Sequence, residues 1–170
     1  MHQEDCDIVE AIVKNFYGED YDTQLPQPNK DAALFHIKMY GAAEMYQIYG
    51  LKEIALIHVK IYFPKAMESG EYAECISTAY RNTAEKDRAL RDFIVKETVQ
   101  DMESFAETEQ LSAALDQAPS FGKDLAYALH ARHKSQLKYM DTCIKDRLSW
   151  CSCNRRLPAG GVRGILKDWQ

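Results

Sequence analysis

Apolar residues recur along most of the chain at intervals of three or four, the spacing that places side chains on one face of an α-helix. The first such segment is residues 7–17. Asp7 is placed to accept hydrogen bonds from its first amide groups, and Gly18 favours its end. Its apolar stripe consists of Ile8, Val9, Ile12, Val13 and Phe16.

Six further helical segments follow, separated by short breaks. Their expected ranges are 31–46, 51–63, 70–82, 85–105, 109–116 and 120–139. We expect Gly50 to form the turn between the second and third helices, Pro64 to end or kink the third, and Thr83 to cap the fifth. Because no segment shows the alternation of a half-buried strand, the sequence predicts an all-α array of about seven helices.

The C-terminal end of the chain differs from the rest. The helical pattern is lost after residue 141, and Pro158, Gly160, Gly161 and Gly164 disfavour an ordered end. Residues 130–170 hold nine basic and three acidic residues, whereas residues 1–30 hold seven acidic residues and two lysines. We therefore expect a flexible basic tail over residues 141–170.

Composition places the chain among intracellular globular domains. It has 170 residues, of which 46% are hydrophobic and 28% charged, and no apolar run approaches the roughly 18 residues that span a bilayer. The acidic N-terminus is unlike a signal peptide, and five cysteines, an odd number, are typical of reduced thiols in the cytoplasm or nucleus. A net charge of −5 argues against a wholly basic nucleic-acid-binding protein, and we expect no membrane partner.

Three segments together resemble one family, the fungal BTB/POZ-domain proteins. Residues 36–55 (HIKMYGAAEMYQIYGLKEIA) are similar to the helix–turn–helix that follows the BTB core, whose pattern is close to V-Y-x-x-A-D-K-Y-x-x-x-G-L-K-x-x-A. Residues 8–21 (IVEAIVKNFYGEDY) resemble the end of that core. Residues 80–92 (YRNTAEKDRALRD) resemble the Y-x-x-T-x-x-x-D-x-x-L-R-D stretch that opens a long helix.

The chain also departs from this pattern. Met45 replaces the lysine before Tyr46, Tyr49 replaces a proline before Gly50, and nothing matches the leading strands and first helices of the core. The resemblance implies that residues 1–25 are a remnant of the end of a BTB core and residues 26–140 its helical C-terminal region. It implies a protein-interaction module of the kind found in ubiquitin-ligase or transcription-related adaptors.

The same resemblance suggests where a partner binds. Without the missing part of the core, the first helix loses its cover, so we expect an exposed apolar patch there. The expected partner-binding residues are Ile8, Ile12, Phe16, Tyr17 and Tyr21. The partner is a protein or a second copy of this chain. The alternative is a nucleic-acid-associated regulator that uses the basic tail around Arg155, Arg156 and Arg163.

Histidines and cysteines are the candidates for chemistry. His58 lies in the most apolar segment, which favours a buried neutral imidazole over a functional base. His130 and His133 have a metal-ligand spacing but lack an HExxH motif. Cys151 and Cys153 are separated by one residue where zinc loops have two to four, although Cys143 and His133 would complete four ligands.

Sequence motifs for catalysis are missing. The chain has no glycine-rich phosphate loop ending in lysine and serine, and no GxSxG nucleophile motif. We therefore expect no enzymatic activity, no catalytic residue, no small-molecule substrate, no cofactor and no resident metal.

Overall fold

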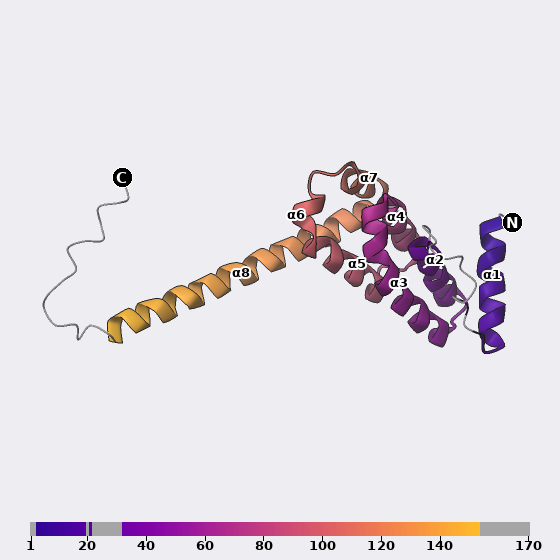
Figure 1. Ribbon diagram of the computed structural model, residues 1–170, viewed down its shortest axis with the longest axis horizontal. Coiled ribbons are helices and arrows are strands. Elements are labelled where there is room, and N and C mark those ends of the chain that lie inside the picture. Colours follow the sequence, from indigo (N-terminus) through magenta and orange to yellow (C-terminus); the bar gives the residue numbers. More distant parts are fainter. Residues whose placement is uncertain (1–2, 20, 22–31, 154–170) are drawn as a thin grey trace, which may run out of the picture. The chain divides into compact units, whose positions relative to one another are not determined.

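The computed structural model describes residues 3–19, 21 and 32–153, and within them the side chains of residues 6–19, 21, 32–67 and 70–145. Over these ranges the chain is all α, as the sequence predicts, with eight helices and no strand (Figure 1). The helices are α1 (Gln3–Phe16), α2 (Ala32–Met45), α3 (Tyr49–Ser69), α4 (Tyr72–Asn82), α5 (Arg88–Gln100), α6 (Met102–Phe105), α7 (Glu109–Gln117) and α8 (Pro119–Cys153).

The chain divides into two compact units, Met1–Leu129 and His130–Gln170. The first unit contains α1 to α7 and the first turns of α8, and the described part of the second is the remainder of α8. The boundaries expected after residues 25 and 140 do not coincide with this division. Among the described residues, no helix has a long enough apolar stretch to cross a bilayer.

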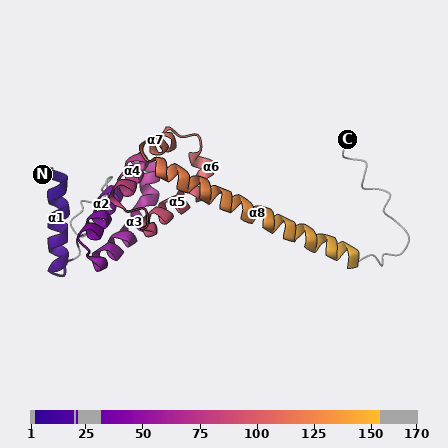
Figure 2. The same ribbon diagram turned by 180° about the vertical axis from the view of Figure 1, so that it is seen from behind.

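The core of the first unit forms around α2, α3 and α4. α2 packs along α3 and against α4, α1 packs on α2, and α7 on α4 (Figures 1 and 2). The side chains at its centre are fully buried, including Ile37, Tyr40, Phe63, Tyr72 and Ile94. α2 is buried on several sides, which explains why its residues are apolar nearly all round.

A small residue brings two helices close together. A Cβ atom built on Gly41 of α2 would lie 2.7 Å from the Cβ of Asn82, the last residue of α4. Carbon atoms in contact normally lie about 3.5–4.0 Å apart, so only glycine fits here. Gly41 therefore sets the distance between α2 and α4.

The turn between α2 and α3 corrects the expectation for Gly50. The chain reverses at residues 46–48, where Gln47 has a φ of 59°, and Gly50 lies inside α3. A Cβ on Gly50 would meet nothing within 4 Å, so this glycine serves neither a turn nor a close approach. Two backbone bonds close the turn, from the Gln47 amide to the Glu44 carbonyl and from the Ile48 amide to the Ala43 carbonyl.

Other helix boundaries also differ from the prediction. Pro64 lies inside α3, which continues to Ser69 and ends at Gly70 with a left-handed φ of 92°. The expected helix over 85–105 is two helices, α5 and α6, separated at Asp101. Thr83 follows the end of α4 and does not begin the next helix.

The first part of the expected flexible tail is helical instead. α8 continues to Cys153, so the segment 141–153 is helical. An exposed helix shows only a narrow apolar stripe, which is why the sequence pattern faded there. The remainder of the expected tail, 154–170, lies outside the described residues.

Candidate interaction surface

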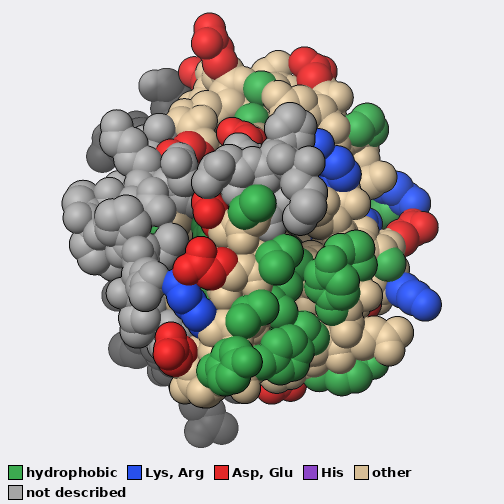
Figure 3. Space-filling view, turned by 90° about the vertical axis from the view of Figure 1, so that its right-hand side faces the viewer, with side chains coloured by type: hydrophobic (Ala, Val, Ile, Leu, Met, Phe, Trp, Pro, Cys, Tyr) green, Lys and Arg blue, Asp and Glu red, His purple; other side chains and the backbone are tan. Residues whose placement is uncertain are grey.

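α1 has more apolar surface than its neighbour covers. Ile8 and Ile12 are buried with Ala11, whereas Val9 and Val13 are exposed. The exposed face continues to Phe16 and, after the helix ends, to Tyr17; we call Val9, Val13, Phe16 and Tyr17 the α1 surface. Figure 3 shows hydrophobic side chains gathered on the side of the molecule that carries α1.

The five residues expected to bind a partner therefore divide into two groups. Phe16 and Tyr17 are exposed, as the expected patch requires. Ile8 and Ile12 are buried because α2 packs on this side of α1. Tyr21 is buried against rings of α2 and α3. The open patch lies on the opposite half of the apolar stripe.

Sequence reasoning therefore missed Val9 and Val13 as surface residues. Both residues belong to the stripe of five apolar positions that the sequence shows. Because successive residues of a helix are rotated by about 100°, these five positions cover more than one face of α1. That excess width was the signal that α2 alone would not cover the whole stripe.

A groove of about 870 Å³ adjoins the α1 surface, between α1, α2 and α4. Its lining includes the apolar residues Ile8, Val9, Ala42, Met45 and Tyr46. Met45 and Tyr46 are exposed. Charged groups of both signs, Lys38, Arg81, Glu44 and Glu74, also line it. The groove thus combines an apolar strip with polar edges, as protein interfaces do.

A polar cluster holds α2, α3 and the start of α5 together. The Tyr40 hydroxyl donates to the Asp87 carboxylate, 2.9 Å from one oxygen and 3.1 Å from the other. Lys52 pairs with the same carboxylate at 2.9 Å and with Glu44 at 2.5 Å. The Lys52 ammonium also lies 5.0 Å from the centre of the Tyr40 ring. Three helices are therefore joined through four side chains.

The pKa values of Tyr40 and Lys52 follow from the contacts of this cluster. Burial and the hydrogen bond to Asp87 raise the pKa of Tyr40 to about 12. Burial would lower the pKa of Lys52, but its hydrogen bonds to Glu44 and Asp87 hold that pKa above its ordinary value. Tyr40 therefore stays protonated and Lys52 stays charged at neutral pH, so neither can serve as a general base.

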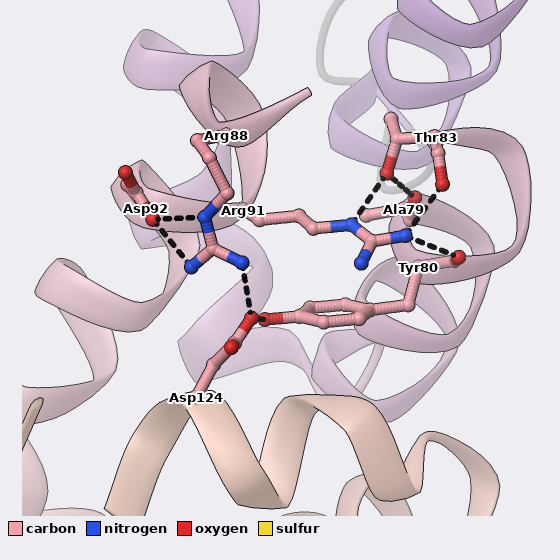
Figure 4. A network of polar contacts seen from close by, with 7 residues as sticks. All are labelled: Ala79, Tyr80, Thr83, Arg88, Arg91, Asp92 and Asp124. Atoms are coloured by element: carbon pink, nitrogen blue, oxygen red, sulfur yellow. Dashed lines mark hydrogen bonds and ion pairs between the residues drawn. The ribbon is translucent and has the colours of Figure 1, made fainter. Parts of the chain in front are cut away.

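A second network joins α4 to α5. Arg91 is buried on α5; its Nε donates to the Thr83 hydroxyl at 2.9 Å, and its Nη2 to the carbonyls of Tyr80 and Thr83 (Figure 4). The Thr83 hydroxyl in turn donates to the Ala79 carbonyl at 2.7 Å. Arg91 thus binds carbonyl groups at the end of α4 that have no helical partner.

The network continues to α8. The Tyr80 hydroxyl donates to the Asp124 carboxylate at 2.8 Å, and Arg88 donates to the same oxygen at 2.9 Å (Figure 4). Arg88 also binds Asp92, one turn further along α5. Burial and the bond to Asp124 raise the pKa of Tyr80 well above its ordinary value. The start of α8 is thereby attached to α4 and α5.

The segments that carry the family resemblance meet in these networks. Tyr40 and Lys52 belong to the motif at 36–55, and they bind Asp87 from the motif at 80–92. Within that second motif, Arg91 binds Thr83. These residue types therefore have a structural explanation in this chain, which is the mutual attachment of α2, α3, α4 and α5.

Histidines of α2 and α3 stack in the core beside Tyr21. His36 is fully buried, and its ring lies 4.7 Å from that of His58 and 5.0 Å from that of Tyr62. Its Nδ1 lies 3.1 Å from the Tyr21 hydroxyl. Burial, together with the neighbouring His58, lowers the pKa of His36 to about 3. The buried neutral imidazole expected at His58 is therefore found at His36, and His58 itself is only half-buried.

The described residues form no cluster of three or more histidine, cysteine or acidic side chains that could hold a metal ion. His130 and His133 are both exposed on α8. The side chains of Cys151 and Cys153 lie outside the described residues, as do Arg155, Arg156 and Arg163, so the structure does not test the cysteine set or the basic tail.

Comparison with protein-family models, curated proteins and solved structures finds no match to this chain.

Proposed function

We propose that this chain is a non-enzymatic protein-interaction module that binds a protein partner or a second copy of itself through the α1 surface and the adjoining groove. The observation that carries the proposal is the open half of α1, where Val9, Val13 and Phe16 face away from the core. Contiguous exposed apolar residues next to a groove are typical of a docking site.

The energetics of α1 support this function. Covering a large apolar side chain contributes about 1.5–3 kcal/mol, so covering three of them would contribute several kcal/mol to binding. Tyr17 and Tyr46 add aromatic groups with a polar tip, which protein interfaces favour. A partner that presents an apolar helix face would gain both contributions.

The use of polar residues supports a non-enzymatic role. Tyr40, Tyr80 and Arg91 are buried polar side chains, and each is bound to another part of the fold. The resemblance to the helical region of fungal BTB/POZ proteins points the same way, to an adaptor that acts in the cytoplasm or nucleus.

Site-specific photocrosslinking tests the proposal. A benzophenone amino acid would replace Phe16, which is 68% exposed, and in a matched control Tyr127, which is 66% exposed on α8. We expect crosslinks to protein from position 16 at several times the yield from position 127 in cells of the source organism. Equal yields at the two positions, or crosslinks only to nucleic acid, would overturn it.

A further inference from the structure

We propose that the α1 surface is covered by the basic half of α8 from a second copy of this chain, in an antiparallel helix pair. This inference rests on the proposed function and names its partner. It follows from three matching properties of the two helices.

The first property is that α8 also carries an open apolar stripe. Leu137, Met140 and Ile144 are all exposed, and their spacing of three and four residues places them on one face of the helix. They belong to the second unit, whose described residues form a single helix. Isolated helices are only marginally stable in water, so a helix of this kind gains from a partner.

The second property is the spacing along the two stripes. On α1 the exposed residues Val9, Val13 and Phe16 are separated by four and then three residues. On α8 the exposed residues are separated by three and then four residues. The spacings of the two stripes therefore match when the two helices run in opposite directions. An antiparallel pair therefore brings Val9 level with Ile144 and Phe16 level with Leu137, with Val13 and Met140 at the centre.

The third property is charge. Residues 1–22 carry seven acidic residues and one lysine, a net charge of −6, whereas residues 130–170 carry nine basic and three acidic residues, a net charge of +6. In the described parts, Asp7, Glu10 and Glu19 are exposed in the first segment, and four basic residues are exposed on the part of α8 that follows His130. These are Arg132, Lys134, Lys138 and Lys145.

Charge also decides which pairing is favoured. Pairing α1 with α1, or α8 with α8, would bring like charges together, whereas α1 with α8 brings opposite charges together. Each copy offers one α1 and one α8, and the proposed assembly makes both contacts. That arrangement is a closed dimer, in which both apolar stripes of each copy are covered.

Light scattering and sedimentation of the full chain test this dimer. At about 50 µM and low salt we expect a dimer, which weakens as salt screens the charges. Val13→Lys or Met140→Glu should each raise the dimer dissociation constant by roughly 30-fold or more, because a charge would be buried in the apolar seam. Ile57→Lys, at an exposed position on α3, is the matched control and should leave it unchanged.

Mixing the two variants is the decisive step. In a dimer of Val13→Lys with Met140→Glu, one contact is wild type and the other pairs lysine with glutamate. An equimolar mixture should therefore regain the dimer that neither variant forms alone. If both variants lose the dimer but the mixture does not regain it, like helices pair with like and the proposal fails.

Two further outcomes would overturn this inference. The wild-type chain could stay monomeric at every concentration, or dimerise with neither variant affected. In either case a crosslink from position 16 to a different protein would leave the proposed function standing, so the two failures are distinguishable. Circular dichroism of each variant, with the helical signal and thermal midpoint that the wild type has when dilute and monomeric, separates a lost contact from a lost fold.

Discussion

The guanidinium of Arg91 lies over the ring of Tyr80, 4.6 Å from its centre, and donates to the carbonyl oxygen of the same residue at 3.1 Å. Within the described part of the chain, its other hydrogen-bond acceptors are the hydroxyl and carbonyl of Thr83. A buried cation thus binds the end of α4, where the partial negative charge of the helix favours it.

Replacing Arg91 by lysine should lower the free energy of unfolding by about 2–3 kcal/mol. A single ammonium cannot reach one hydroxyl and two carbonyls in the plane that a guanidinium spans, and buried groups would lose their partners. Urea denaturation measures the change. Arg88→Lys is the control, and because Arg88 is partly exposed it should cost less than about 1 kcal/mol. Equal losses in the two variants would contradict this account of Arg91.

Gly41→Ala and Gly50→Ala should have opposite effects. At Gly41 the new methyl group would lie 2.7 Å from the Cβ of Asn82, which is fixed to the backbone, so α2 and α4 must move apart. We expect a loss of about 1–3 kcal/mol. At Gly50 the methyl group meets nothing, and alanine is the better helix former, so we expect a gain of roughly 0.5–1 kcal/mol. Thermal unfolding of the two variants measures both effects.

A second substitution checks the cause of the Gly41 effect. Asn82→Gly removes the Cβ that the new methyl group would strike. In the double variant the loss from Gly41→Ala should therefore be smaller than in the wild-type background. If the two losses simply add, the contact between α2 and α4 does not set the requirement for glycine.

Tyr40→Phe and Asp87→Asn should be strongly coupled. Tyr40→Phe removes the donor of the hydrogen bonds between the Tyr40 hydroxyl and the Asp87 carboxylate, and Asp87→Asn removes the negative charge of their acceptor. A double-mutant cycle by urea denaturation should give a coupling energy of about 1–2 kcal/mol, since this bond is charge-assisted and partly buried. The same cycle with Tyr40→Phe and Asp124→Asn, which belongs to the other network, should give a value near zero.

The sequence predicted the helices better than their ends. Periodicity identifies a helix because it reports which face is buried, but a helix end is decided by tertiary contacts. Gly50 and Pro64 both looked like helix breaks, yet α3 begins before Gly50 and continues past Pro64. Gln47 forms the turn instead, with a positive φ that no sequence rule assigns to glutamine.

The candidate site was only half predictable, for a related reason. The pattern showed that α1 is apolar over a wide arc, but it could not show which half α2 would cover. Nor could it pair Tyr40 with Asp87, because these residues are 47 positions apart and meet only when α2 packs near the start of α5. Local patterns give the faces of helices, and only the fold shows which faces meet.

His36 should make the fold sensitive to mild acid. Burial, with the neighbouring His58, lowers its pKa to about 3 in the folded chain, whereas an unfolded chain binds the proton at about pH 6.5. Below pH 6.5 the unfolded state therefore holds more protons, and stability falls as the pH falls. Between pH 7.5 and pH 5 this single group should remove about 2 kcal/mol from the free energy of unfolding.

That contribution is the difference between two profiles of the free energy of unfolding against pH, one for the wild type and one for His36→Phe. Urea denaturation at pH 7.5, 6.5, 5.5 and 5 measures both profiles. The variant should lose less stability on acidification, by about 2 kcal/mol over the range, because its aromatic ring fills the stack without binding a proton. Ile37→Val, at the next buried position of α2, is the control. It should lower stability by the same amount at every pH, so its profile should stay parallel to that of the wild type. A His36→Phe profile that also runs parallel would show that His36 carries its proton in the core.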